Sequence, residues 1–149
     1  MVIQMAKVQY LMEILEELKE NAQQVSEKEV EEMAACILKA ERIFVAGAGR
    51  SGFAARAFAN RLMHLGLNVF FVGEPTTPAV GGGDLLIIGS GSGETESLVV
   101  MAQKARRLKA AVATVTIHPE ASIGRLSECR IVLPGATPKS DLADTCKTV

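Results

Sequence analysis

The chain has 149 residues, the size of one domain that can bury its own hydrophobic core. Its 16 lysines and arginines nearly balance 17 aspartates and glutamates, and a net charge of −1 argues against a nucleic-acid partner, which needs a strong positive field. The N-terminus lacks the apolar core of a signal peptide, and no apolar run approaches the roughly 20 residues of a membrane-spanning helix. Three widely spaced cysteines in no metal-binding pattern are expected to be reduced thiols, so we predict a cytoplasmic protein.

Two helices are expected before any strand. Residues 3–20 repeat apolar side chains at spacings of three and four, as the buried face of an amphipathic helix does: Val8, Leu11, Met12, Leu15 and Leu18. A second helix is predicted to begin at Ser26, whose hydroxyl can cap the helix, while Glu29 can reach back to complete a capping box.

From Arg42 onward, short apolar runs alternate with helical stretches, which is typical of βαβ units in a parallel sheet. The expected strands are residues 43–46, 69–72, 85–88, 112–116 and 131–133. One helix is predicted at 51–65, ended by Gly66 in a left-handed conformation, and another at 95–108, with Leu98, Met101, Ala105 and Leu108 as its buried stripe. The predicted fold is a single α/β domain, a three-layer α/β/α sandwich around a five-stranded parallel sheet: helices in 1–40, sheet core in 41–134, loop in 135–149.

A glycine-rich turn follows the first predicted strand at residues 47–52, with the sequence GAGRSG. Glycines allow a sharp turn and close approach to a ligand, and the free N–H groups of a helix start favour an anion. The turn also satisfies G-x-G-x-x-G, and Glu74 ends the second predicted strand, where a dinucleotide site would place its ribose-binding acid. A small dinucleotide-binding domain is therefore one alternative, and a turn that serves the fold alone is another.

A second motif, SGSGET at residues 90–95, lies between the third predicted strand and the next helix. It places three hydroxyls and several backbone N–H groups at a positive helix end, a combination that can bind a phosphate monoester without a metal. A dinucleotide site needs no such cluster at this point, so the motif favours a sugar phosphate. The alternative is a plain turn in which Thr95 only caps the helix.

Five segments together carry a resemblance to a known family: residues 46–52, 58–66, 72–74, 77–78 and 90–95. In this order they resemble the SIS (sugar isomerase) family and, within it, the 6-phospho-3-hexuloisomerases. The resemblance implies interconversion of 3-hexulose 6-phosphate and fructose 6-phosphate through an enediol, as part of formaldehyde fixation by the ribulose monophosphate route. It also implies a homotetramer that uses no metal or other cofactor. The apolar content of 48% independently favours an oligomer, because sister subunits can cover apolar surface.

The resemblance assigns substrate binding to residues of both loops: Gly49, Arg50, Ser51, Ser90, Gly91, Ser92, Gly93, Glu94 and Thr95. His64 matches a family histidine and is expected to transfer a proton or bind a sugar hydroxyl, or else to lie at an oligomer interface. His118, before Pro119, is expected to be a surface turn residue.

The resemblance places the general base, a glutamate, on a C-terminal helix beyond the position of Val149. We therefore expect the chain as written to bind the sugar phosphate but to isomerise it slowly, because a general base contributes roughly 10²- to 10⁴-fold. A non-catalytic sugar-phosphate-sensing SIS module is the alternative from a different functional class.

Overall fold

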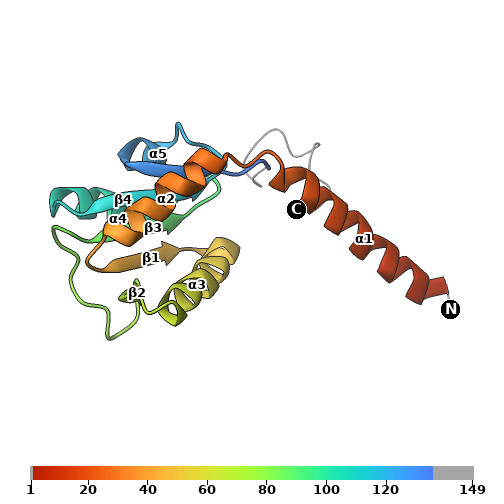
Figure 1. The fold of residues 1–149 in the computed structure, drawn as a ribbon, viewed down its shortest axis with the longest axis horizontal. Helices are drawn as coiled ribbons and strands as arrows, with labels where there is room; N and C mark the ends of the chain where they lie inside the picture. Colours follow the sequence, from red (N-terminus) through yellow and green to blue (C-terminus); the bar gives the residue numbers. More distant parts are fainter. Residues whose placement is uncertain (1, 136–149) are drawn as a thin grey trace.

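The computed structural model describes residues 2–135, with side chains from residue 8 onward. Five strands form one sheet in the order β2-β1-β3-β4-β5, and every neighbouring pair is parallel (Figure 1). The bounds are β1 Ile43–Gly47, β2 Val69–Phe71, β3 Leu85–Gly89, β4 Ala111–Thr116 and β5 Cys129–Val132. The five expected strands are confirmed to within two residues at each end. The expected loop after Gly135, and Cys146 within it, lie outside the described residues.

The helices are α1 Val2–Ala22, α2 Glu27–Lys39, α3 Gly49–His64, α4 Glu96–Arg107 and α5 Ser122–Leu126. Four of them match the predicted helices, and Gly66 has the expected positive φ of 85° just beyond α3. The sequence did not predict α5, because five residues are too few to show a helical period.

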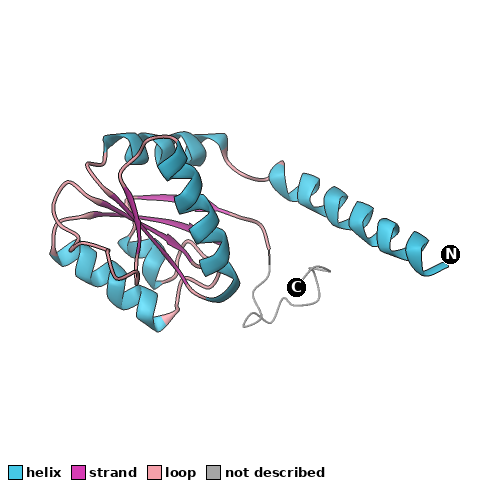
Figure 2. Cartoon of the chain, turned by 90° about the horizontal axis from the view of Figure 1, so that it is seen from below, coloured by secondary structure: helices cyan, strands magenta, loops and turns pink. Residues whose placement is uncertain are grey.

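Helices cover both faces of the sheet, as Figure 2 shows. On one face, α2 and α3 pack against side chains such as Ile43 and Val45. On the other, α4 and α5 pack against Phe44 and Ala46, which alternate with the first pair along β1. Strands buried on both faces read as continuous apolar runs, which is why the sequence showed runs rather than alternation. The three-layer α/β/α architecture is thus confirmed.

The stripe predicted for α4 is partly wrong. Leu98 and Ala105 are buried as expected, but the third buried residue is Ala102, which lies one helical turn from Leu98. Met101 is only half-buried, and Leu108, just beyond the helix, is 43% exposed. Two of the three buried residues of α4 are thus alanines, whereas the larger Met101 and Leu108 stay partly accessible to solvent.

The first helix extends away from the sheet and its covering helices (Figure 1). Its expected apolar face is therefore exposed rather than buried: Val8, Leu11, Met12, Leu15 and Leu18 are each about half accessible to solvent, at 59, 55, 59, 49 and 58%. Within the described residues, no helix is long and apolar enough to span a membrane.

The cap predicted for α2 forms, but the capping box does not. Ser26 accepts a hydrogen bond from the N–H of Glu29 at 3.4 Å. The Glu29 carboxylate accepts instead from the N–H of Val132 on β5, at 2.9 Å. A tertiary contact of α2 with the edge strand thus replaces the local one, because Val132 offers a strand N–H beside the helix start.

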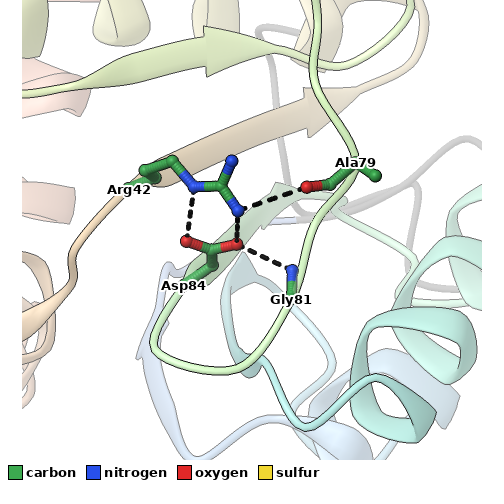
Figure 3. A network of polar contacts seen from close by, with 4 residues as sticks. All are labelled: Arg42, Ala79, Gly81 and Asp84. Atoms are coloured by element: carbon green, nitrogen blue, oxygen red, sulfur yellow. Dashed lines mark hydrogen bonds and ion pairs between the residues drawn. The ribbon is translucent and has the colours of Figure 1, made fainter.

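Arg42 and Asp84 form a bidentate ion pair just before β1 and β3 (Figure 3). Nε of Arg42 donates to Oδ1 of Asp84 at 2.9 Å, and Nη2 donates to Oδ2 at 2.6 Å and to the carbonyl of Ala79 at 3.2 Å. The N–H of Gly81 donates to the same Oδ2 at 2.7 Å. Asp84 is only 2% exposed, so this pair fastens the β2–β3 connection to the amino ends of two central strands.

Cys36 of α2 and Cys129 of β5 are both free thiols, as the sequence predicts. Burial, together with a hydrogen bond to Cys36, raises the pKa of Cys129 to about 12. The Cys129 thiol is therefore protonated and unreactive at neutral pH.

Candidate functional site

Both loops singled out in the sequence lie at the carboxyl edge of the sheet. Residues 47–52 follow β1 and residues 90–95 follow β3, and these two strands are neighbours in register from Ile43 with Leu85 to Gly47 with Gly89. In parallel α/β sheets, this edge is where ligands bind. The ion pair of Asp84 with Arg42 lies at the opposite, amino edge of the sheet, so the length of the strands separates it from the candidate site.

The turn at 47–52 depends on two glycines that pack against each other. A Cβ on Gly47 would lie 2.9 Å from the Cα of Gly52, and a Cβ on Gly52 would lie 2.9 Å from the carbonyl oxygen of Gly47. Gly49 has a φ of +54°, which glycine adopts without strain. These contacts bring the start of α3 directly onto the end of β1, so that its N–H groups face the site.

The loop at 90–95 presents its hydroxyls in an ordered arrangement. The Ser90 hydroxyl accepts from the N–H of Gly93 at 3.2 Å, and the Ser92 hydroxyl accepts from the N–H of Glu94 at 3.3 Å. A hydroxyl that accepts from the backbone still has its own proton to donate. Thr95 occupies the N-cap position of α4, but its side chain makes no capping hydrogen bond in the described part of the chain. Three O–H groups thus remain for an anion at a helix start.

A pocket of about 400 Å³ opens between these loops. Ser51, Ser90, Gly91 and Thr116 contribute its polar part. The remaining walls are mainly apolar and include Ala54, Ala55, Phe58, Ile117 and Leu133. Among the described residues that line it, none has a titratable side chain. The pocket can therefore bind and orient a ligand, but a group that moves protons must reach it from elsewhere.

The other predicted binding residues are not among those that line the pocket: Gly49, Arg50, Ser92, Gly93, Glu94 and Thr95. Arg50, in the first turn of α3, is exposed and forms no ion pair within residues 2–135. Glu94 is exposed, and its carboxylate accepts from the N–H and the hydroxyl of Ser122 on α5, at 2.6 and 2.8 Å. These hydrogen bonds lower the pKa of Glu94, with the backbone bond as the largest cause. Glu94 is thus an ionised carboxylate whose acceptors are directed at α5.

His64 lies far from this pocket within one chain. Ser51 and His64 are near opposite ends of α3, separated by about 20 Å at a rise of about 1.5 Å per residue. His64 is exposed at the amino edge of the sheet. The prediction from the sequence placed Ser51 and His64 on the same helix but did not consider the distance between the two ends of that helix.

Glu74, the acid of the dinucleotide alternative, is paired with α3. Its Oε1 accepts from Nη1 of Arg56 at 2.6 Å, and the Arg56 guanidinium stacks over Phe71 at 4.0 Å from the ring centre. Both partners of the ion pair are about half exposed, at 51 and 45%. This arrangement gives Glu74 a local structural role.

The connection from β4 to α5 adds residues that the sequence did not assign to the site. Thr116 lines the pocket and donates through its hydroxyl to the carbonyl of Gly91 at 3.2 Å. His118 lies in a turn, as expected, but it is half-buried, and its carbonyl would lie 3.4 Å from a Cβ on Gly93. The available signal was the alternation of polar and apolar residues from Thr114 to Ser122 at a strand end, which carries no recognisable motif.

A family model described as SIS domain matches residues 36–148. The chain belongs to the SIS domain family. It is 48% identical over 145 residues to the 3-hexulose-6-phosphate isomerase of Bacillus subtilis, a match that covers 97% of this chain and 78% of that protein. It is 40% identical to the 3-hexulose-6-phosphate isomerase of Mycobacterium gastri, over 83% of this chain and 62% of that protein.

Solved structures agree with the SIS fold. A crystal structure of a hypothetical protein superposes with a TM-score of 0.83 at 38% identity and covers 91% of this chain and 72% of its own. The crystal structure of a hypothetical protein from Methanococcus jannaschii, described as inferring a function of 3-hexulose-6-phosphate isomerase, has a TM-score of 0.70 at 38% identity. That match covers 75% of this SIS chain and 63% of the other.

Proposed function

We propose that this SIS protein interconverts 3-hexulose 6-phosphate and fructose 6-phosphate. The observation that carries the proposal is the loop at 90–95, which places three hydroxyls at a helix start and lines the pocket at the carboxyl edge of the sheet through Ser90 and Gly91. The names of the relatives from Bacillus subtilis and Mycobacterium gastri support this substrate pair. The ribulose monophosphate route and a cytoplasmic location belong to the same proposal, the latter supported by the free thiols of Cys36 and Cys129.

The reaction moves the carbonyl from C3 to C2 of the sugar. A base removes the proton from C2 while O3 gains a proton, which gives the 2,3-enediol. O2 then loses its proton and C3 is protonated, which gives the 2-ketose. We assign to Ser90, Ser92 and Thr95 the binding of the phosphate, and to Ser51 and the apolar walls the placement of the carbon chain. Binding of the phosphate is common to ground state and transition state, so it contributes mainly to affinity.

The base of this proposal comes from outside the described pocket lining, which holds no titratable side chain. The glutamate that the family resemblance places beyond Val149 is not among the 149 residues of the sequence. The experiment that tests the function couples formation of fructose 6-phosphate from 3-hexulose 6-phosphate to NADPH production. Absence of turnover, even by the chain extended to the full length of its relatives, would contradict the proposal.

Replacing Ser92 with alanine is expected to weaken binding of fructose 6-phosphate about tenfold. The substitution removes one hydrogen-bond donor to a charged group and the acceptor of the Glu94 N–H; the lower end of the range for such a hydrogen bond, roughly 1.5 kcal/mol, corresponds to the tenfold loss. Calorimetry with fructose 6-phosphate measures the loss of affinity. Unphosphorylated fructose is the control ligand, because its inhibition of the isomerase reaction should be the same in both proteins. Equal affinity of the wild type and the Ser92→Ala variant for fructose 6-phosphate would show that Ser92 does not bind the phosphate.

We propose further that copies of this chain cover the apolar face of α1 in a homo-oligomer, a tetramer by family resemblance. An isolated helix is marginal in water, and an apolar stripe exposed along about three turns is stabilised when it packs against another surface. Changing Leu15 to Glu in this stripe should therefore yield a smaller species in light scattering. Gln9→Glu adds the same charge beside the stripe and should leave the assembly intact. A monomeric wild-type protein at micromolar concentration would contradict the proposal.

A further inference from the structure

Glu94 lies within the loop 90–95, called the phosphate loop below, but its carboxylate accepts hydrogen bonds from another element, α5. Both of its oxygens accept hydrogen bonds from Ser122, one from the backbone N–H at 2.6 Å and one from the hydroxyl at 2.8 Å. Ser122 is the first residue of α5, and Glu94 is separated from it by all of α4 and β4. The contact therefore joins the phosphate loop to the following βα connection.

Other hydrogen bonds join the same two segments. The N–H of Ile123 donates to the carbonyl of Gly93 at 3.1 Å, and the N–H of Ile117 donates to the carbonyl of Gly91 at 3.1 Å. Gly93 has a φ of +64° and lies so close to Ala121 that a Cβ would be 2.6 Å from the Cβ of Ala121. The shape of the loop 90–95 thus depends on the segment 116–123. The hydrogen bonds between the Glu94 carboxylate and Ser122 join the two segments at their solvent-exposed side.

We propose that Glu94 is a positioning residue: its hydrogen bonds with Ser122 hold the loop 90–95 in its anion-binding shape. The Glu94 carboxylate does not itself contact the substrate. A carboxylate facing a phosphate dianion would repel it, whereas one that accepts from Ser122 fixes the adjacent N–H groups. An ordered loop binds an anion more tightly, because it does not lose conformational entropy on binding. The inference rests on the proposed function for the identity of the anion.

The test uses Ser122→Ala, which removes one of the two contacts, and Glu94→Gln, which removes the charge. Each should raise KM for 3-hexulose 6-phosphate about five- to tenfold while kcat stays within about twofold, because phosphate binding contributes to affinity rather than to turnover. Ser122→Thr keeps the hydroxyl and should restore the wild-type KM. The matched control is Ser127→Ala: this hydroxyl lies just beyond the other end of α5 and donates to the carbonyl of Ile123 at 2.8 Å rather than to the loop.

A second readout does not depend on catalysis. Sulfate, an anion of similar shape, should bind to Ser122→Ala and Glu94→Gln about five- to tenfold more weakly than to the wild type and the Ser127→Ala variant, as measured by calorimetry. If the wild type binds sulfate but has no isomerase activity, the proposed function fails and the sulfate series alone decides the role of Glu94. Unchanged KM and unchanged sulfate affinity in both variants would overturn the inference. So would a kcat loss without a KM change in Glu94→Gln, which would place the carboxylate in the chemistry.

Discussion

Replacing Asp84 with alanine is expected to lower the free energy of unfolding by about 2–3 kcal/mol, the largest stability effect of any single ion pair in the described chain. Asp84 is 2% exposed and accepts from Nε and Nη2 of Arg42 and from the N–H of Gly81. Removing one partner of a buried pair costs roughly 3–5 kcal/mol, because the other partner is left without compensation. Arg42 is one-third exposed and can regain some hydration, which reduces the cost to the lower figure.

Urea denaturation of both proteins measures this difference. The matched control is Glu74→Ala, which breaks another arginine–carboxylate pair that is about half exposed and contributes little. Because the Asp84 network lies at the amino edge of the sheet, folded Asp84→Ala protein should bind fructose 6-phosphate as the wild type does. An unfolding midpoint equal to that of the wild type would show that the network in Figure 3 does not stabilise the fold.

Replacing Gly93 with alanine is expected to weaken binding of fructose 6-phosphate by at least tenfold, the largest effect on the site. The φ of +64° costs a residue with a Cβ roughly 1–2 kcal/mol. The new Cβ would also lie 2.6 Å from the Cβ of Ala121, too close for either backbone to stay in place. The loop must then move away from α5, and the hydroxyls of Ser90 and Ser92 lose their common alignment.

A double variant separates the two causes. Gly93→Ala combined with Ala121→Gly removes the Cβ contact but keeps the backbone strain, so calorimetry should show part of the affinity regained. Gly82→Ala is the control, since its Cβ would meet only atoms at 3.9 Å and its φ lies outside the left-handed region. Wild-type affinity in the Gly93→Ala single variant would mean that the loop does not need its observed shape to bind the ester.

The local features of the fold could be predicted from the sequence because their causes are local. A run such as residues 43–46 is apolar because a central parallel strand is buried on both faces, and the runs alternate with helices because parallel strands need crossovers. Gly66 ends α3 because only glycine adopts its φ of 85° without strain. The two loops of the candidate site were found for the same reason, since each lies directly between a strand and its helix.

Contacts between segments distant in sequence were decided by the tertiary structure alone. The sequence offers many polar residues that could pair with the carboxylate of Glu94. Ser122 is its partner because α5 packs against the loop 90–95. In the same way, Asp84 meets Arg42 across 42 residues because β1 and β3 are neighbours in the sheet. His64 is separated from Ser51 by the length of α3. Composition and periodicity specify which residues form each element, but the partner of a polar side chain depends on which elements the sheet order brings together.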